Sequence, residues 1–211
     1  MDVPYRQIRA VYDEATVRVY QAYRPEIAVA AVGAQRFVPP FKRERMTWIK
    51  PSFLWMMYRC GYATKPGQEH VLAVDISREG FEWALAHSCL SHFDGDVHAD
   101  HDAWARRLRE SPVRIQWDPE RDFAFNALPY RSVQIGLSGE AARRYVDEWT
   151  VAITDVTEDA RAVHAAVRAG DLERAVALLP VERPYPLSPG LAEAIAATTT
   201  GTAAKTRPEG G

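Results

Sequence analysis

Basic and aromatic side chains that can hold a phosphorylated ligand gather between Arg36 and Lys50. Within this segment five basic residues stand against one acid: Arg36, Lys42, Arg43, Arg45 and Lys50. Arginine and lysine donate hydrogen bonds to phosphate oxygens, and a ring such as Trp48 stacks on a base. The Pro39-Pro40 step stiffens the segment and lowers the cost of ordering it on binding. The pattern predicts a site for a nucleotide or single-stranded RNA. The alternative is that these cations cover the next helix with their stems and pair with acids elsewhere.

A second group of candidates lies on the first two expected strands and on the later segment RSVQIGL. Its members are Arg6, Arg9, Tyr12, Tyr20, Tyr23, Arg131 and Gln134. Because side chains alternate along a strand, Arg18 and Tyr20 share one face, which can hold the diphosphate or ribose of a ligand. Tyr20 and Trp48 are the stacking candidates. The alternative is a set of salt bridges on the sheet surface with tyrosines in the core.

The segment HSCLSHFDGDVHADHD interleaves four histidines with four aspartates. The histidines are His87, His92, His98 and His101. Nitrogen and oxygen ligands at this density can bind zinc, manganese or iron. However, the spacing matches neither HExxH nor a calcium loop. A solvated loop in which Asp100 caps the next helix explains most of the pattern, so we expect no metal here.

Several common catalytic patterns are missing from the sequence. No GxGxxG follows an expected strand, and neither GxxxxGK[ST] nor GxSxG occurs. Glu140, Asp147 and Glu148 are candidate general bases, although charge on a helix surface is the simpler interpretation of each. Cys60 and Cys89 match no paired metal motif, and we expect both to be reduced packing residues.

Composition and charge bound the class of protein. The chain has 211 residues, of which 47% are apolar and 26% charged, as expected for one globular domain. No apolar run is long enough to cross a membrane, and the N-terminus lacks the profile of a secretory signal, so we expect a cytoplasmic protein. Residues 1–65 contain 11 Lys and Arg against 5 Asp and Glu, whereas the rest of the chain is acidic. The N-terminal third is therefore where an anion would be drawn.

The pattern of residues predicts an α+β fold with a mixed, mainly antiparallel sheet that opens with a β-hairpin of residues 6–12 and 16–23. Helices are expected to begin at Pro25 and after Pro51, the second ending at Gly61. Further strands are expected at 70–76, 113–117, 131–137 and 150–154, and a helical hairpin at 157–180. A polar loop is expected from Ser88 to Asp100. We expect one domain, residues 1–187, followed by a disordered tail, residues 188–211.

The chain also resembles a bacterial and fungal family catalogued as domain of unknown function 4291. The resemblance rests on RQIRAVYDEATVRVYQAY, on AQRFVPPFKRERMTWIKPSFLWMMYRCGYATKPGQE, on LPYRSVQIGLSGEA and on shorter blocks. It spans roughly residues 4–187, and the block FKRERMTWIKPSFLWMMYR makes it specific. The resemblance implies a single domain of this length and assigns no catalytic residues.

Three hypotheses for function follow. The first is a nucleotide- or RNA-directed enzyme, a transferase that uses a nucleotide donor such as NAD in the manner of compact ADP-ribosyltransferase-like folds. It predicts a deep pocket that joins the opening strands to the basic segment and contains an inward carboxylate. The second is a non-catalytic module that binds RNA or another acidic partner. The third is a metal-dependent hydrolase, which requires the four histidines to converge.

Overall fold

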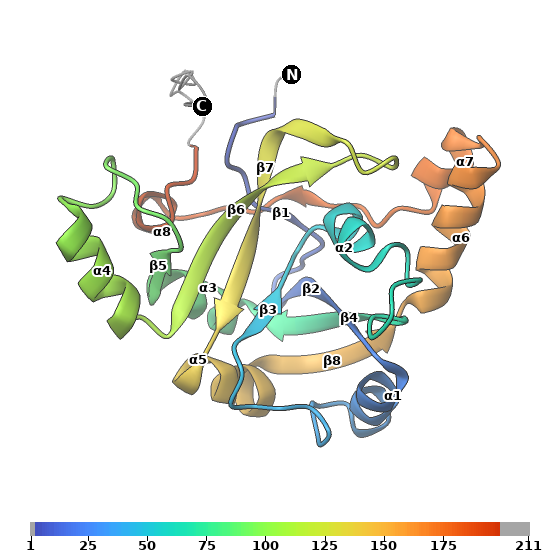
Figure 1. Ribbon diagram of the computed structural model, residues 1–211, viewed down its shortest axis with the longest axis horizontal. Coiled ribbons are helices and arrows are strands. Elements are labelled where there is room, and N and C mark those ends of the chain that lie inside the picture. Colours follow the sequence, from blue (N-terminus) through green and yellow to red (C-terminus); the bar gives the residue numbers. More distant parts are fainter. Residues whose placement is uncertain (1–2, 199–211) are drawn as a thin grey trace.

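The computed structural model describes residues 3–198 and has the α+β architecture expected from the sequence (Figure 1). In chain order its elements are β1 Arg9–Ala10, β2 Thr16–Tyr23, α1 Pro25–Ala34, β3 Thr47–Ile49, α2 Phe53–Cys60, β4 His70–Ser77, α3 Arg78–Ala86, β5 Ser88–Leu90, α4 His101–Glu110, β6 Val113–Arg121, β7 Ala127–Leu137, α5 Gly139–Arg144, the π-helical turn η1 Tyr145–Trp149, β8 Thr150–Asp155, α6 Thr157–Arg168, α7 Leu172–Ala177, β9 Arg183–Pro184 and α8 Pro189–Ala194. No helix within the described residues is long and apolar enough to cross a membrane.

The strands form three sheets. One has the order β2-β4-β8 and is antiparallel, and another has the order β3-β7-β6-β5, in which only β5 runs parallel to its neighbour. A short third sheet pairs β1 with β9. The two larger sheets meet where Tyr20 and Lys50 form an isolated bridge with two backbone hydrogen bonds, of 2.7 and 3.3 Å. This bridge places the basic segment beside the opening strands.

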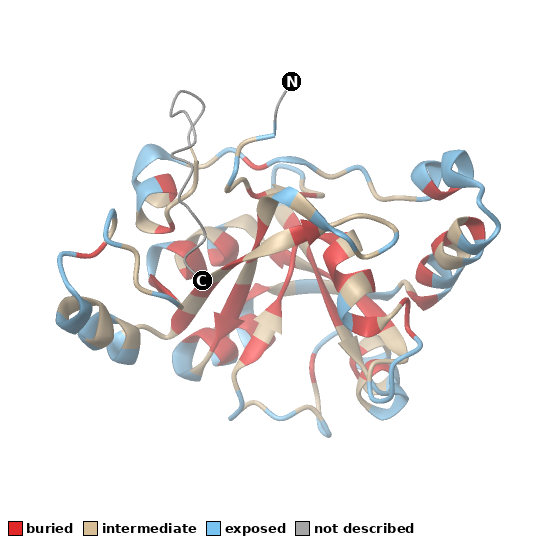
Figure 2. Ribbon diagram, turned by 45° about the horizontal axis from the view of Figure 1, so that its top comes forward, coloured by how far each residue is buried: buried red, intermediate tan, exposed pale blue. Residues whose placement is uncertain are grey.

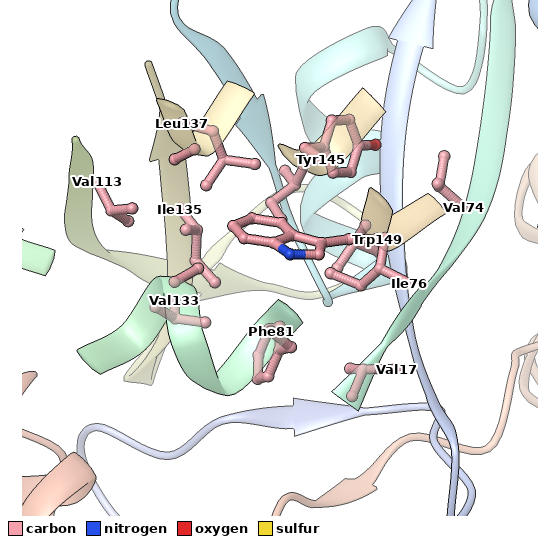
Figure 3. Close-up of a cluster of buried hydrophobic side chains, with 14 of the residues drawn as sticks. Val17, Val74, Ile76, Phe81, Val113, Val133, Ile135, Leu137, Tyr145 and Trp149 are labelled. Carbon is pink, nitrogen blue, oxygen red and sulfur yellow. The ribbon is translucent and has the colours of Figure 1, made fainter. Parts of the chain in front are cut away.

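The main core fills the space between the two larger sheets. Figure 3 shows Trp149 surrounded by apolar side chains from β4, β7 and α3. A second apolar cluster lies on the other side of β4, under α2 and α6. Strand β4 is therefore buried on both faces, which explains why its sequence is a nearly continuous apolar run. Figure 2 shows the buried residues concentrated on these strands and on the inner sides of the helices.

Local signals placed many elements correctly. Pro25 occupies the first turn of α1, the Ser52 side chain caps α2, and Gly61 ends α2 in the left-handed conformation with φ of 60°. Strand β2 has the predicted bounds, and β4 extends one residue further than predicted. The helical hairpin is confirmed as α6 and α7, which pack together at one end of the molecule (Figure 1).

Three expectations need correction. The opening hairpin is formed only next to its turn, where Tyr12 pairs with Val17. The preceding strand β1 pairs with β9 and not with β2. The first residues of the expected polar loop, Ser88–Leu90, form β5, which pairs with β6. The expected disorder from residue 188 is wrong for residues 188–198, since α8 packs on the domain and the carbonyl of the fully buried Ile195 accepts a 2.7 Å hydrogen bond from the Trp117 indole. Residues 199–211 lie outside the described residues.

A close approach in the core supplies a test of the packing. A Cβ atom added to Gly80 would lie 2.3 Å from Cγ of the Trp149 ring. We expect Gly80→Ala to lower the free energy of unfolding by about 1–3 kcal/mol, because Trp149 is enclosed and cannot move without disturbing its neighbours. Urea denaturation followed by circular dichroism measures the change.

Gly33→Ala is the matched control, since an added Cβ at Gly33 meets nothing within 4 Å in helix α1. It should leave stability unchanged or raise it by up to about 1 kcal/mol. Equal effects of the two substitutions would contradict the packing at Trp149.

Candidate functional site

One face of the β6–β7 ribbon is polar and borders both clefts of the candidate site. On β6, Gln116 and Asp118 alternate with residues that face the core, and Glu120 follows where the register shifts near the end of the strand. Gln134 pairs with Gln116 across the ribbon, and Ser132 pairs with Asp118. The alternation of a strand thus sets a row of polar side chains on one side of the sheet.

Lys50 lies against the middle of this polar face. Its ammonium donates to Asp118 Oδ2 at 3.0 Å and to the Ser132 carbonyl at 3.2 Å, and it lies 4.0 Å from the centre of the Trp55 ring. The Lys50 side chain is only 1% exposed. Burial lowers the pKa of Lys50 to about 8, and the Asp118 charge opposes this shift. Its contacts give Lys50 a structural role, so the structure does not place it among the cations free to bind phosphate.

A cleft of about 310 Å³ lies where β6 ends, and we call it the carboxylate cleft because Glu120 and Glu182 both line it. Its lining residues are Arg9, Ser52, Phe53, Leu54, Glu120, Arg121, Asp122, Phe123, Leu128, Tyr130, Leu179, Pro180 and Glu182. It joins the opening strand, through Arg9, to the start of α2, directly after the basic segment. Carboxylates and arginines therefore meet in one concave site.

The first turn of α2 positions the carboxyl group of Glu182. The Ser52 hydroxyl accepts from the Trp55 amide at 3.1 Å, and the Phe53 amide donates to Glu182 Oε1 at 2.7 Å. Both interactions satisfy amide groups that a helix leaves free at its N-terminus. Glu182 comes from the segment after α7, so this contact also ties that segment to α2.

Glu182 holds a proton over an unusually wide pH range. Burial raises the pKa of its carboxyl from 4.5 to about 8, and the neighbouring Glu120 adds to the increase, while the Phe53 amide and Arg9 oppose it. At neutral pH the side chain is thus mainly a neutral carboxylic acid, which can donate a hydrogen bond.

Two arginines lie beside these carboxylates. Arg9 is half-buried and donates to the Glu182 carbonyl at 3.2 Å. Arg121 donates to the Phe125 carbonyl at 3.1 Å and stacks 4.1 Å from the centre of the Tyr58 ring. Its buried Nε has no hydrogen-bond partner within residues 3–198. A buried donor without an acceptor favours a ligand that supplies one.

A larger cleft of about 600 Å³ lies beside β3, and we call it the basic cleft. Five cations line it: Arg24, Lys42, Arg45, Lys50 and Arg59. No carboxylate of the described residues is among its lining side chains. Trp48 and Phe41 contribute aromatic walls, and Gln134 belongs to the polar face of β7. The basic cleft contains much of the segment that the sequence predicts as a phosphate site.

Other predicted site residues have different surroundings. Arg36 and Arg43 form ion pairs with Asp147, at 3.6 and 2.9 Å, outside both clefts. Arg6 pairs with Asp94 at 2.9 Å, also away from the clefts. Tyr20 is buried and packs edge-on against a phenylalanine ring of α2, so it offers no face for a ligand base. Apart from the ion-paired Lys50, the predicted site residues that line a cleft are Arg9, Tyr23, Lys42, Arg45, Trp48 and Gln134.

The four histidines do not converge. His87 stacks on Trp83, and His101 stacks on Phe93, each with ring centres 3.9 Å apart. His98 is buried, with its Nε2 3.7 Å from the sulfur of Cys89. No group of three or more His, Cys, Asp or Glu side chains in the described part of the chain is arranged to hold a metal ion. The convergence required by the hydrolase hypothesis is absent there.

The comparisons with known proteins place most of the chain in one family. Residues 7–185 match the family described as Domain of unknown function (DUF4291). The chain belongs to this family. None of the curated proteins matches it. All residues that line the two clefts lie inside the part of the chain that the DUF4291 family covers.

The sequence analysis of this DUF4291 chain did not identify Glu120 and Glu182 as site residues. Glu140 and Glu148, the candidate bases it named beside Asp147, form ion pairs with nearby arginines on the surface. The alternation in VRIQWDPER does place Glu120 on the polar side of β6, so that residue had a signal. No sequence pattern indicated Glu182, because only folding brings this residue to the start of α2.

The Lys50–Asp118 pair can be tested by a double-mutant cycle. We expect Lys50→Met or Asp118→Leu alone to lower the free energy of unfolding by about 3–5 kcal/mol, since each leaves a poorly solvated charge without its partner. The double variant should lose much less than the sum, because no unpaired charge remains. Urea denaturation of all four proteins measures the coupling.

Arg18 and Asp75 provide the matched control, since they form a two-pronged pair at 2.8 Å on more exposed strand positions. Their cycle should give a coupling of about 1 kcal/mol or less. A Lys50–Asp118 coupling no larger than this would contradict the structural role of Lys50.

The raised pKa of Glu182 makes stability depend on pH. Between about 4.5 and 8 the folded chain keeps a proton that the unfolded chain releases. The contribution of this proton is complete below pH 4.5 and is lost as pH rises through about 8, so Glu182 makes the free energy of unfolding fall across this window. We expect Glu182→Gln to remove that slope, as measured by urea denaturation at a series of pH values.

The control is Glu173→Gln, which alters an exposed carboxylate on α7. It should retain the wild-type dependence on pH. An unchanged profile for Glu182→Gln would show that Glu182 titrates normally.

Proposed function

We propose that this chain is a nucleotide-directed enzyme, a transferase that uses a nucleotide donor such as NAD and works in the carboxylate cleft. The observation that supports the proposal is the meeting of Arg9, Glu120 and Glu182 in one cleft beside the start of α2. The cleft supports the transferase hypothesis because it holds carboxyl groups beside the opening strand and the start of α2, the helix that follows the basic segment.

Phosphate is the ligand group that the arginines of the cleft suit. Arg9 and Arg121 line the cleft from distant parts of the sequence, and Arg121 Nε is a buried donor without a partner among the described residues. Guanidinium groups bind phosphate through paired hydrogen bonds. The volume of about 310 Å³ is at the lower end of the range for small-molecule sites, which suits the ribose end of a donor.

The two carboxyl groups suit transfer at a ribose carbon. Glu120 stabilises the positive charge that develops on C1′ as the bond to nicotinamide breaks and both bonding electrons leave with nicotinamide. A hydroxyl of the acceptor forms the new bond to C1′, and Glu120 takes its proton. The neutral Glu182 donates a hydrogen bond to a ribose hydroxyl. The products are the ADP-ribosylated acceptor, nicotinamide and one proton.

Release of nicotinamide from NAD tests this proposal. We expect Glu120→Gln to reduce the rate by about 10²–10⁴-fold, the usual contribution of general acid–base catalysis, while stabilisation of the protein by NAD in a thermal-shift assay persists. Arg9→Ala should weaken that stabilisation.

Glu140→Gln, on exposed helix α5, is the matched control and should leave the rate unchanged. If NAD neither stabilises the wild-type protein nor is consumed by it, the donor assignment is wrong. If Glu120→Gln retains the full rate, Glu120 is not the catalytic carboxylate.

A further inference from the structure

The basic cleft has the properties of a site for single-stranded RNA. Its cations come from separate segments: Arg24 precedes α1, Lys42 and Arg45 lie before β3, and Arg59 lies in the last turn of α2. Lys42, Arg45 and Arg59 take part in no ion pair within residues 3–198, unlike Arg36 and Arg43. Three uncompensated cations around one cleft without a carboxylate favour a ligand with several negative charges.

Trp48 gives this cleft a rigid aromatic surface. The edge of its ring lies against Gly136 of β7, where an added Cβ would come within 2.9 Å of two ring carbons. The Trp48 carbonyl accepts from Gln21 at 3.0 Å, which fixes the strand that presents the ring. Cations and an aromatic ring in one cleft are the combination with which proteins bind single strands, through phosphates and stacked bases.

We propose that the basic cleft binds single-stranded RNA and that this RNA is the acceptor for the transfer reaction, so the second part rests on the proposed function. Helix α2 borders both clefts. Ser52, Phe53 and Leu54 line the carboxylate cleft, whereas Met56 and Arg59 line the basic cleft. An RNA strand along the basic cleft is thereby held beside the same helix that positions Glu182.

Binding of a fluorescent oligoribonucleotide of about eight nucleotides, followed by anisotropy over a range of salt concentrations, tests the site. Each phosphate neutralised on a single strand contributes about −0.7 to the slope of log K against log salt. We therefore expect Lys42→Ala/Arg45→Ala to weaken binding and to make the slope about 1.4 smaller. Trp48→Leu should weaken binding about tenfold without changing the slope, because stacking releases no counterions.

Arg106→Ala/Arg109→Ala is the matched control, because it removes two exposed cations from α4, distant from α2 in both views (Figures 1 and 2). It should leave affinity and slope unchanged. Equal losses in the two double variants would overturn the site, since binding would then follow net charge alone. Full competition by AMP at comparable concentration would also overturn it, by indicating a mononucleotide site.

Nicotinamide release without RNA separates this inference from the proposed function. Lys42→Ala/Arg45→Ala should keep that activity, and Glu120→Gln should keep RNA binding. RNA binding without NAD consumption by the wild-type protein would remove the transferase and leave a binding module. NAD consumption without RNA binding would overturn the inference and leave the transferase.

Discussion

Lys50 lies where the two larger sheets meet, and its side chain forms a buried ion pair with Asp118. The Lys50 backbone pairs with Tyr20 of β2, and its side chain reaches Asp118 of β6. A buried lysine without a partner would be costly, so the two sheets are held in the arrangement that brings Asp118 to it. Pro51 and Ser52 follow immediately and start α2, so the same junction fixes the helix that borders both clefts.

Some charged residues form ion pairs within the fold, whereas others line the two clefts. On the polar face of β6, Asp118 lies at the centre and neutralises Lys50, whereas Glu120 lies further along the strand, in the carboxylate cleft. The cations of the basic segment divide in the same way. Arg36 and Arg43 pair with Asp147, while Lys42 and Arg45 have no such pair within the described residues and face the basic cleft. Residue type therefore shows which side chains can bind a phosphate. The folded structure determines which of these side chains reach a cleft and which are held in ion pairs.

The elements that sequence reasoning located correctly are those with local causes. Pro25 begins a helix and Gly61 ends one, because each effect acts within a single turn of chain. The candidate site depends on distant pairings instead. Glu120 and Glu182 meet because β1 pairs with β9, the strand that immediately follows Glu182, and no local pattern encodes that pairing. The four histidines do not converge for a related reason, since His87 and His101 stack on separate aromatic rings.

The extent of the family match bears on which features belong to the shared domain. The match ends at residue 185, just after Glu182 and β9, so it includes the segment that closes the carboxylate cleft. Helix α8 lies beyond it and supports β6 from behind, through the contact between Trp117 and the Ile195 carbonyl. That contact braces the strand that presents Glu120 but lines neither cleft. A function common to the family would therefore be sought in the two clefts and the helix between them, with α8 serving stability.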